Sequence, residues 1–237
     1  MNATITSLAF RALLGRRRFW LFVAFPVCLS LIALLVRAMT GDPEAAWSTL
    51  MGLGVSILVP LMALIAASSV LGPEMDDGSI VYLLAKPVNR YSVALSKYVV
   101  AAASTLVMGV LPLLVIGLVV HPDEPSASFA AAAGAGLSAI TYTAGFLALS
   151  ATLRGAVIVG LLYTLIWEGT LGNVLSGIAW LSVHQWGQRL AYALHRPLDG
   201  PDITLWWALL ASTLVVVGGV WFAGDRLRSY SLRGGDE

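Results

Sequence analysis

Six apolar runs, each long enough to cross a lipid bilayer as a helix, constrain this chain more than any other feature. The hydrocarbon core of a bilayer is about 30 Å thick, so a helix of about 20 apolar residues spans it. Inside the bilayer every backbone polar group needs a partner within the protein, and helices supply these partners. The predicted spans are residues 19–39, 49–71, 98–120, 129–153, 156–172 and 203–224. We therefore predict an all-α membrane protein with six transmembrane helices, in a single transmembrane domain that comprises residues 1–237.

The composition agrees with a protein whose main solvent is lipid. Hydrophobic residues make up 58% and charged residues 11% of the sequence. Charged residues are about a quarter of an ordinary soluble domain. The few charged residues of this chain are therefore expected where it meets water or another protein.

The distribution of lysine and arginine predicts how the helices cross. These residues are retained on the cytoplasmic side during insertion. If both termini are cytoplasmic, eleven of the fourteen bases lie on that side, and only Arg37, Arg189 and Arg196 lie outside. The acids on the outer side are Asp42, Glu44, Asp123, Glu124, Glu168, Asp199 and Asp202. We therefore predict that both termini are cytoplasmic.

Two segments outside the spans have helical patterns of their own. Residues 1–18 carry apolar residues at helical spacing, which predicts an interfacial helix on the inner leaflet; a basic lead that only sets the topology is the alternative. Residues 173–202 form an outer segment whose Gly-rich first part predicts a short re-entrant element. Its second part predicts an amphipathic helix on the outer leaflet or over the bundle. The expected apolar face of that helix comprises Val183, Trp186, Leu190, Ala193 and Leu194, with His184 facing away.

The sequence lacks the residues that common catalytic, metal and ion-coupled sites need. It has no G-x-x-x-x-G-K-[ST] loop for nucleotide phosphates, and neither H-E-x-x-H nor a cysteine pair for a metal. An intramembrane protease serine needs a nearby base, and no histidine lies in a predicted span. Glu168 is the only acid placed to lie within the membrane, which leaves little for proton or sodium coupling. We therefore predict no catalytic residue, no metal site and no nucleic-acid partner.

The segment from Gly72 to Lys97 is an island of charge between the second and third spans. Asp76, Asp77 and Gly78 can begin a short helix, because acids favour a helix N-terminus. Pro87 would end it, since the residue before a proline is pushed out of the helical conformation. The apolar patch between these points is poorly suited to solvent alone. The pattern predicts a short helix that docks in a groove of a partner; a charged hairpin that only satisfies the topology is the alternative.

This segment resembles the cytoplasmic loop after the second span of ABC-2 family permeases. The matching positions are Glu74, Gly78, Ser79, Leu83, Leu84, Pro87, Arg90 and Lys97. The resemblance implies that residues 72–97 contain a coupling helix that contacts a separate ATPase subunit, with Asp76 and Asp77 also in the coupling set. Arg90 and Lys97 serve equally well as anchors for lipid phosphates.

A second part of the chain resembles one branch of small ABC-2 permeases. It comprises Trp167-Glu168, Asn173 and Leu181-Ser182. We interpret Trp167, Glu168, Asn173 and Trp186 as a candidate outer gate or partner contact. The alternative for Glu168 is an interfacial acid at a helix end.

The family resemblance implies the membrane subunit of an ATP-driven exporter in a bacterial cytoplasmic (inner) membrane. Two copies would pair as a homodimer, each docked on an ABC ATPase subunit. ATP and Mg would be held by the ATPase, with no cofactor on this chain. The nearly uncharged spans favour a hydrophobic or amphiphilic cargo. The alternative is a permease that transmits force to an extracytoplasmic partner protein, as in copper-enzyme maturation, and the third hypothesis is a six-span secondary carrier.

Overall fold

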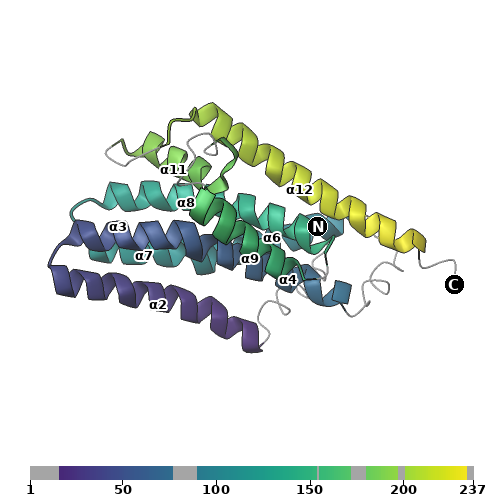
Figure 1. Ribbon diagram of the computed structural model, residues 1–237, viewed down its shortest axis with the longest axis horizontal. Coiled ribbons are helices and arrows are strands. Elements are labelled where there is room, and N and C mark those ends of the chain that lie inside the picture. The colour runs from purple at the N-terminus through teal and green to yellow at the C-terminus, as the bar shows by residue number, and fades with distance from the viewer. Residues whose placement is uncertain (1–15, 77–89, 154, 172–179, 197–200, 234–237) are drawn as a thin grey trace.

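Helices form almost all of the chain that the computed structural model describes, which comprises residues 16–76, 90–153, 155–171, 180–196 and 201–233 (Figure 1). Within these ranges there are helices and no strands, which confirms the predicted all-α class. The α-helices are α2 (Arg16–Thr40), α3 (Pro43–Leu53), α4 (Val59–Asp76), α6 (Arg90–Thr105), α7 (Leu111–Val120), α8 (Pro125–Ser150), α9 (Ala156–Leu162), α11 (Val183–Leu194) and α12 (Leu205–Arg233). Three π-helical segments continue or connect them: η1 (Gly54–Leu58), η2 (Leu106–Val110) and η3 (Tyr163–Leu171). The interfacial helix predicted for residues 1–18 lies almost wholly outside the described residues.

Five stretches are long and apolar enough to cross a membrane. They are Trp20–Thr40, Pro43–Leu71, Arg90–Val120, Pro125–Ser150 and Leu205–Leu227. They correspond to the first four and the last of the predicted spans. The fifth predicted span contains the shorter apolar helix Ala156–Glu168, which rises only about 20 Å. Because the hydrocarbon core is about 30 Å thick, helix length supports five crossings among the described residues.

Helices α3 and α6 begin well before the apolar runs that predicted them. The second span was expected from residue 49, whereas α3 begins at Pro43. The Asp42 carboxylate caps this helix by accepting a hydrogen bond from the Glu44 N–H at 2.9 Å, and proline suits the first turn because its missing N–H would be unpaired there anyway. The third was expected from residue 98, whereas α6 begins at Arg90. Apolar length detects the spans and misses the polar turns that start them.

Two of the π-helical segments lie directly before prolines. η1 ends two residues before Pro60, and η2 ends two residues before Pro112. A proline ring clashes with the carbonyl four residues earlier, which here belongs to Ser56 or Met108 inside the π-helical segment. A π-helical turn holds an extra residue and gives that carbonyl more room. We therefore attribute both segments to the prolines that follow them.

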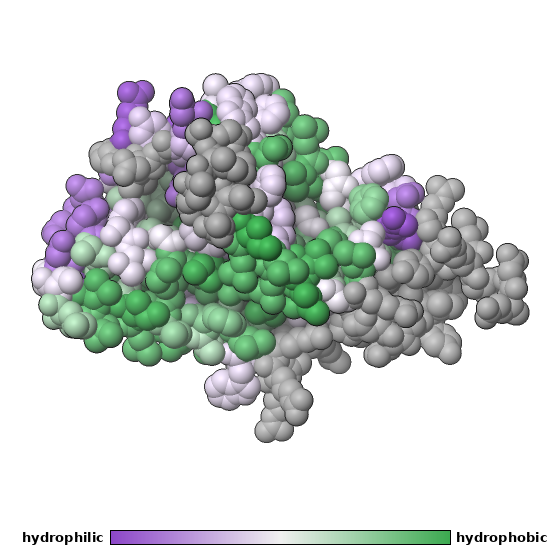
Figure 2. All heavy atoms as spheres, viewed as in Figure 1, coloured by the Kyte–Doolittle hydropathy of each residue, from purple (hydrophilic) through white to green (hydrophobic). Residues whose placement is uncertain are grey.

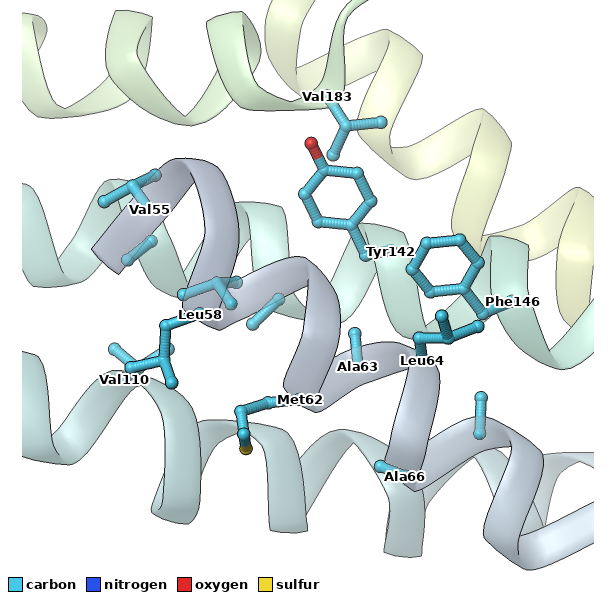
Figure 3. Close-up of a cluster of buried hydrophobic side chains, with 14 of the residues drawn as sticks. Val55, Leu58, Met62, Ala63, Leu64, Ala66, Val110, Tyr142, Phe146 and Val183 are labelled. Atoms are coloured by element: carbon cyan, nitrogen blue, oxygen red, sulfur yellow. The ribbon is translucent and has the colours of Figure 1, made fainter. Parts of the chain in front are cut away.

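Helix α8 lies at the centre of the bundle and packs against α4, α6, α7, α9, α11 and α12. Most of its buried residues are alanine, glycine, serine or threonine, which let neighbouring helices approach closely. Larger side chains fill the core beside it in Figure 3, including Met62 and Leu64 of α4. Tyr142 and Phe146 of α8 stack there with ring centroids 5.8 Å apart. By contrast, α2 lies at one edge with its side chains largely exposed, and a broad hydrophobic band crosses the face shown in Figure 2, as expected for a surface that meets lipid.

The helices turn at two opposite ends of the bundle. The end at the left of Figure 1 holds the α2–α3 and α7–α8 turns. The opposite end holds the last turns of α4 and the last turns of α12. We call these the outer end and the inner end, following the orientation predicted from the lysine and arginine residues.

Arg37 joins the outer ends of α2 and α7. Its Nη1 donates to the carbonyl oxygen of Val119 at 2.8 Å and to that of Val120. The last carbonyls of a helix have no partner within it. Arg37 therefore supplies hydrogen bonds that α7 cannot make for itself.

We expect Arg37→Met to lower the free energy of unfolding by about 1–2 kcal/mol, because a hydrogen bond from a charged group contributes about 1.5–3 kcal/mol and water replaces part of it. Thermal unfolding in detergent should show a decrease of about 2–6 °C in Tm. Arg196→Met, at an exposed position of the same end, is the matched control. Equal shifts in the two variants would contradict this role of Arg37.

Candidate functional site

Helix α11 runs antiparallel to the outer half of α8. The Ser138 hydroxyl, about halfway along α8, donates to the Val183 carbonyl oxygen at 3.2 Å, at the start of α11. At the other end of the pair, His195 Nε2 lies 3.6 Å from the Glu124 carboxylate, next to the start of α8. The first turn of α11 therefore lies deep in the bundle, and its last turn reaches the outer end.

The two helices touch through small residues. A Cβ atom added to Gly187 would overlap the Ser138 hydroxyl and lie 2.6 Å from the Gly134 carbonyl oxygen. A Cβ added to Gly134 would lie 3.1 Å from the Cβ of Ala191 and overlap the Gly187 carbonyl oxygen. Gly134 and Ser138 are four residues apart, as are Gly187 and Ala191, which is the small-xxx-small spacing of closely packed membrane helices.

This contact changes the face that the sequence predicted for α11. Val183 and Trp186 are buried as expected, but Leu194 is 60% exposed. His184, expected to face away, is 8% exposed. The reason is that close approach to α8 requires the small residues of α11 rather than its largest ones. The helix also lies beside α8, instead of resting on the outer leaflet or over the bundle.

Glu168 occupies the buried N-terminus of α11. Its side chain is 4% exposed and lies in η3. The carboxylate accepts hydrogen bonds from the Ser182 hydroxyl at 2.5 Å, the Val183 N–H at 3.1 Å and the Tyr163 hydroxyl at 3.2 Å. The first N–H groups of a helix lack partners within it and carry partial positive charge, so a carboxylate is well suited to this position. Glu168 therefore joins the end of η3 to the start of α11.

An aromatic cavity lies next to this carboxylate. Its volume is about 410 Å³, and it lies between α8, α9, η3, α11 and α12. Tyr142, Phe146, Tyr163 and Trp186 supply aromatic walls, and aliphatic side chains supply most of the rest. The Phe146 ring meets the Tyr163 ring edge-on, with centroids 6.3 Å apart. The Tyr142 hydroxyl is buried and has no hydrogen-bond partner among the described residues; in Figure 3 it points towards Val183.

Three tryptophans hold the segment before α11 in place. The indole N–H groups of Trp186 and Trp207 both donate to the Trp180 carbonyl oxygen, at 3.2 and 2.9 Å. The rings of Trp180 and Trp207 lie 5.5 Å apart. Buried polar atoms of a chain segment need such partners at membrane depth. This cluster links α11 to the start of α12.

The structure brings together two of the four residues that the sequence proposed as an outer gate or partner contact. Glu168 and Trp186 both lie at the start of α11. Trp167 is half-buried, and its indole nitrogen has no acceptor among the described residues. Asn173 lies outside the described residues. Tyr142 and Tyr163 were missed because each lies within an apolar run, where no spacing distinguishes it from a core aromatic residue.

A model of the ABC-2 family transporter protein matches residues 14–167, which is well over half of the chain. The chain belongs to the ABC-2 transporter family. It is therefore the permease of an ABC transporter and a transport subunit rather than a catalytic one, as the resemblance in the 72–97 segment predicted. Family membership replaces the hypothesis of a six-span secondary carrier. The comparison with curated proteins gives no match.

In this ABC-2 permease the two helices that flank the predicted coupling segment are joined at the inner end. Lys97 of α6 is 2% exposed, and its Nζ donates to the Val70 carbonyl oxygen of α4 at 2.8 Å. A side chain this deeply buried does not reach lipid phosphates, which argues against the anchor alternative for Lys97. Glu74 and Asp76 lie in the last turns of α4, and Arg90 begins α6. The remaining coupling candidates, Asp77, Gly78, Ser79, Leu83, Leu84 and Pro87, lie outside the described residues.

Proposed function

We propose that this chain is the membrane subunit of an ATP-driven ABC-2 exporter that moves a hydrophobic or amphiphilic substrate. Family membership implies an ABC ATPase partner. The sequence has no nucleotide-phosphate loop of its own. ATP and Mg would therefore be held by separate ATPase subunits, and two permease copies would pair in a bacterial cytoplasmic membrane.

The observation that carries this proposal is the hydrogen bond between Lys97 and Val70. It joins α4 and α6 just beyond the two ends of the coupling segment. α4 packs in turn against α8 and α9. A force applied to residues 77–89 would therefore move α4 and α6 together and pass directly to the centre of the bundle.

We further propose that the chain crosses the membrane six times, and that its fifth crossing is discontinuous. α9 starts at the inner end, directly after α8, and η3 brings Glu168 to the deep end of α11. α11 then continues to the outer end beside the start of α8. The helix formed by α9 and η3, followed by α11, thus supplies the length that α9 and η3 alone lack. With six crossings, both termini would be cytoplasmic.

The coupling proposal predicts that changes in residues 72–97 uncouple the permease from its ATPase. Glu74→Arg and Gly78→Trp should each reduce co-purification of the ATPase by about tenfold or more, because a misplaced charge or bulky residue at a docking surface costs several kcal/mol. Arg196→Met at the outer end should leave recovery unchanged. Unchanged recovery in both loop variants would contradict the proposed docking role, and failure of the wild-type chain to bind an ATPase would contradict the proposed function.

A second function is favoured by the exposed aromatic side chains around the starts of α11 and α12. Trp206 is 76% and Trp180 43% exposed, and aromatic residues are frequent in protein interfaces. The same permease could pass force to an extracytoplasmic partner protein. ATP-dependent uptake of substrate into inverted vesicles would support export. A stable complex with an exported protein that is lost in Trp206→Ala, without vesicle transport, would support force transmission.

A further inference from the structure

We propose that the aromatic cavity beside Glu168 binds a lipophilic monovalent cation. This inference rests on the proposed export function, because the cation would be the amphiphilic substrate. Its basis is the combination of a buried carboxylate, four aromatic side chains in the cavity wall and a lining that is otherwise mainly apolar.

The carboxylate of Glu168 supplies the negative charge. It accepts hydrogen bonds from one N–H group and two hydroxyl groups. The ion pairs found among the described residues are those of His121 with Glu44 and His195 with Glu124, and neither includes Glu168. A carboxylate that has no cationic partner among the described residues attracts a cation strongly across a medium of low dielectric constant. The site therefore favours a positive ligand over a neutral or negative one.

The cavity walls carry this preference to the ligand. Tyr142, Tyr163 and Val183 all line the cavity. Tyr163 and Val183 also donate hydrogen bonds to the carboxylate of Glu168, which lies behind the cavity wall. Aromatic faces attract cations, most strongly where water is excluded. The Tyr163 hydroxyl donates to a carboxylate, which increases the electron density of its ring. The negative potential thus reaches the cavity through aromatic surfaces.

The same walls determine the kind of cation. A small ion such as sodium would lose its water shell and find few oxygen ligands, because the lining is mainly apolar. A cation whose charge is spread over a hydrophobic body loses much less hydration free energy when it enters the cavity. The volume of about 410 Å³ is within the range of pockets for drug-sized molecules. Leu181 and Val159, 59% and 42% exposed, lie where the cavity opens to the surface of the bundle.

Two ions of the same shape and opposite charge provide a direct test. Tetraphenylphosphonium and tetraphenylborate would each be titrated calorimetrically into the full-length permease in detergent, with empty micelles subtracted. We expect the phosphonium ion to bind at least about tenfold more tightly than the borate. Equal binding of the two ions, tighter binding of the borate, or no binding of either would overturn the proposal.

Variants then locate the binding site. Glu168→Gln should weaken phosphonium binding about tenfold to thirtyfold, since it removes the charge and keeps the shape. Gly145 lines the cavity and has open space around its missing Cβ, so Gly145→Leu should fill the cavity and abolish binding. Gly218→Leu, at an α12 position with the same open surroundings outside the cavity, should bind like wild type. Unchanged binding in Gly145→Leu would refute the site even if Glu168→Gln fails to fold.

These titrations need no ATPase, so they separate this inference from the proposed function. A permease that stimulates its ATPase but does not bind the phosphonium ion would refute the substrate class alone. A permease that binds the ion but no ATPase would refute the export function and leave the site intact.

Discussion

Gly187→Val is expected to prevent the permease from forming a stable bundle. The added side chain would meet the Ser138 hydroxyl and the Gly134 carbonyl oxygen. The Gly134 carbonyl oxygen is backbone and cannot turn away, and rotating the Ser138 hydroxyl would break its hydrogen bond to the Val183 carbonyl oxygen. Overpacking of a core costs about 1–3 kcal/mol where side chains can adjust, so the cost here should be about 3 kcal/mol or more. Size-exclusion chromatography and thermal unfolding would show loss of monodisperse protein, or a Tm lowered by about 6–12 °C.

Gly145→Val is the matched control for this substitution. It lies on α8, the partner helix, and no atom lies within 4 Å of its missing Cβ. We expect its Tm to stay within about 2 °C of wild type, because valine has a somewhat higher helix propensity than glycine. Similar stability of the Gly187 and Gly145 variants would show that α11 does not pack against α8 as described.

Lys97→Met is expected to abolish stimulation of the ATPase by the permease while leaving most of the protein folded. Methionine keeps the length and apolar body of the side chain but cannot donate to the Val70 carbonyl oxygen. Val70 lies inside α4, so its carbonyl oxygen keeps its place in the helical hydrogen-bond pattern, and loss of one bond from a charged donor should cost about 1.5–3 kcal/mol, which a bundle of this size should tolerate. The larger effect is mechanical, since α4 and α6 would still pack together but would lose the hydrogen bond that fixes them to each other beside the coupling segment. Steady-state ATP hydrolysis by the reconstituted complex would measure it.

The control for Lys97→Met is Leu95→Met, on the same helix. Leu95 is 44% exposed, so the substitution introduces methionine without changing a buried contact. Its ATPase stimulation should match wild type. If Lys97→Met retains full stimulation at wild-type stability, the link between α4 and α6 does not transmit the force.

The lengths of the apolar runs predicted the five long helices, because the thickness of the bilayer fixes the length of a spanning helix whatever the detailed packing. The same criterion could not describe α11, which is short and buries small residues such as Gly187 rather than a broad apolar face. The helical spacing of apolar residues predicted an amphipathic surface helix there instead. The sequence singled out Glu168 as the one acid placed to lie within the membrane, where a charge is costly, and the structure buries its side chain at the start of α11.

The partners of these residues could not be predicted, because they depend on how helices distant in sequence meet. Tyr142 lies in an apolar run of α8 and gives no local sign that it lies beside a carboxylate from η3. The burial of Lys97 likewise follows from the packing of α6 against α4. In the sequence, Lys97 is a base near other charged residues, so binding to lipid phosphates was an equally good interpretation. The sequence thus indicated which polar residues mattered and not what each of them touches.

The break between η3 and α11 has a mechanical consequence. An unbroken helix transmits a push along its axis from one membrane surface to the other. Here α9 and η3, which contact α4 and η1 respectively, lie on one side of the break, whereas α11 packs closely against α8 on the other. We therefore propose that Glu168, which joins the end of η3 to the start of α11, lets a movement that begins at the inner end tilt α9 and η3 without displacing α11.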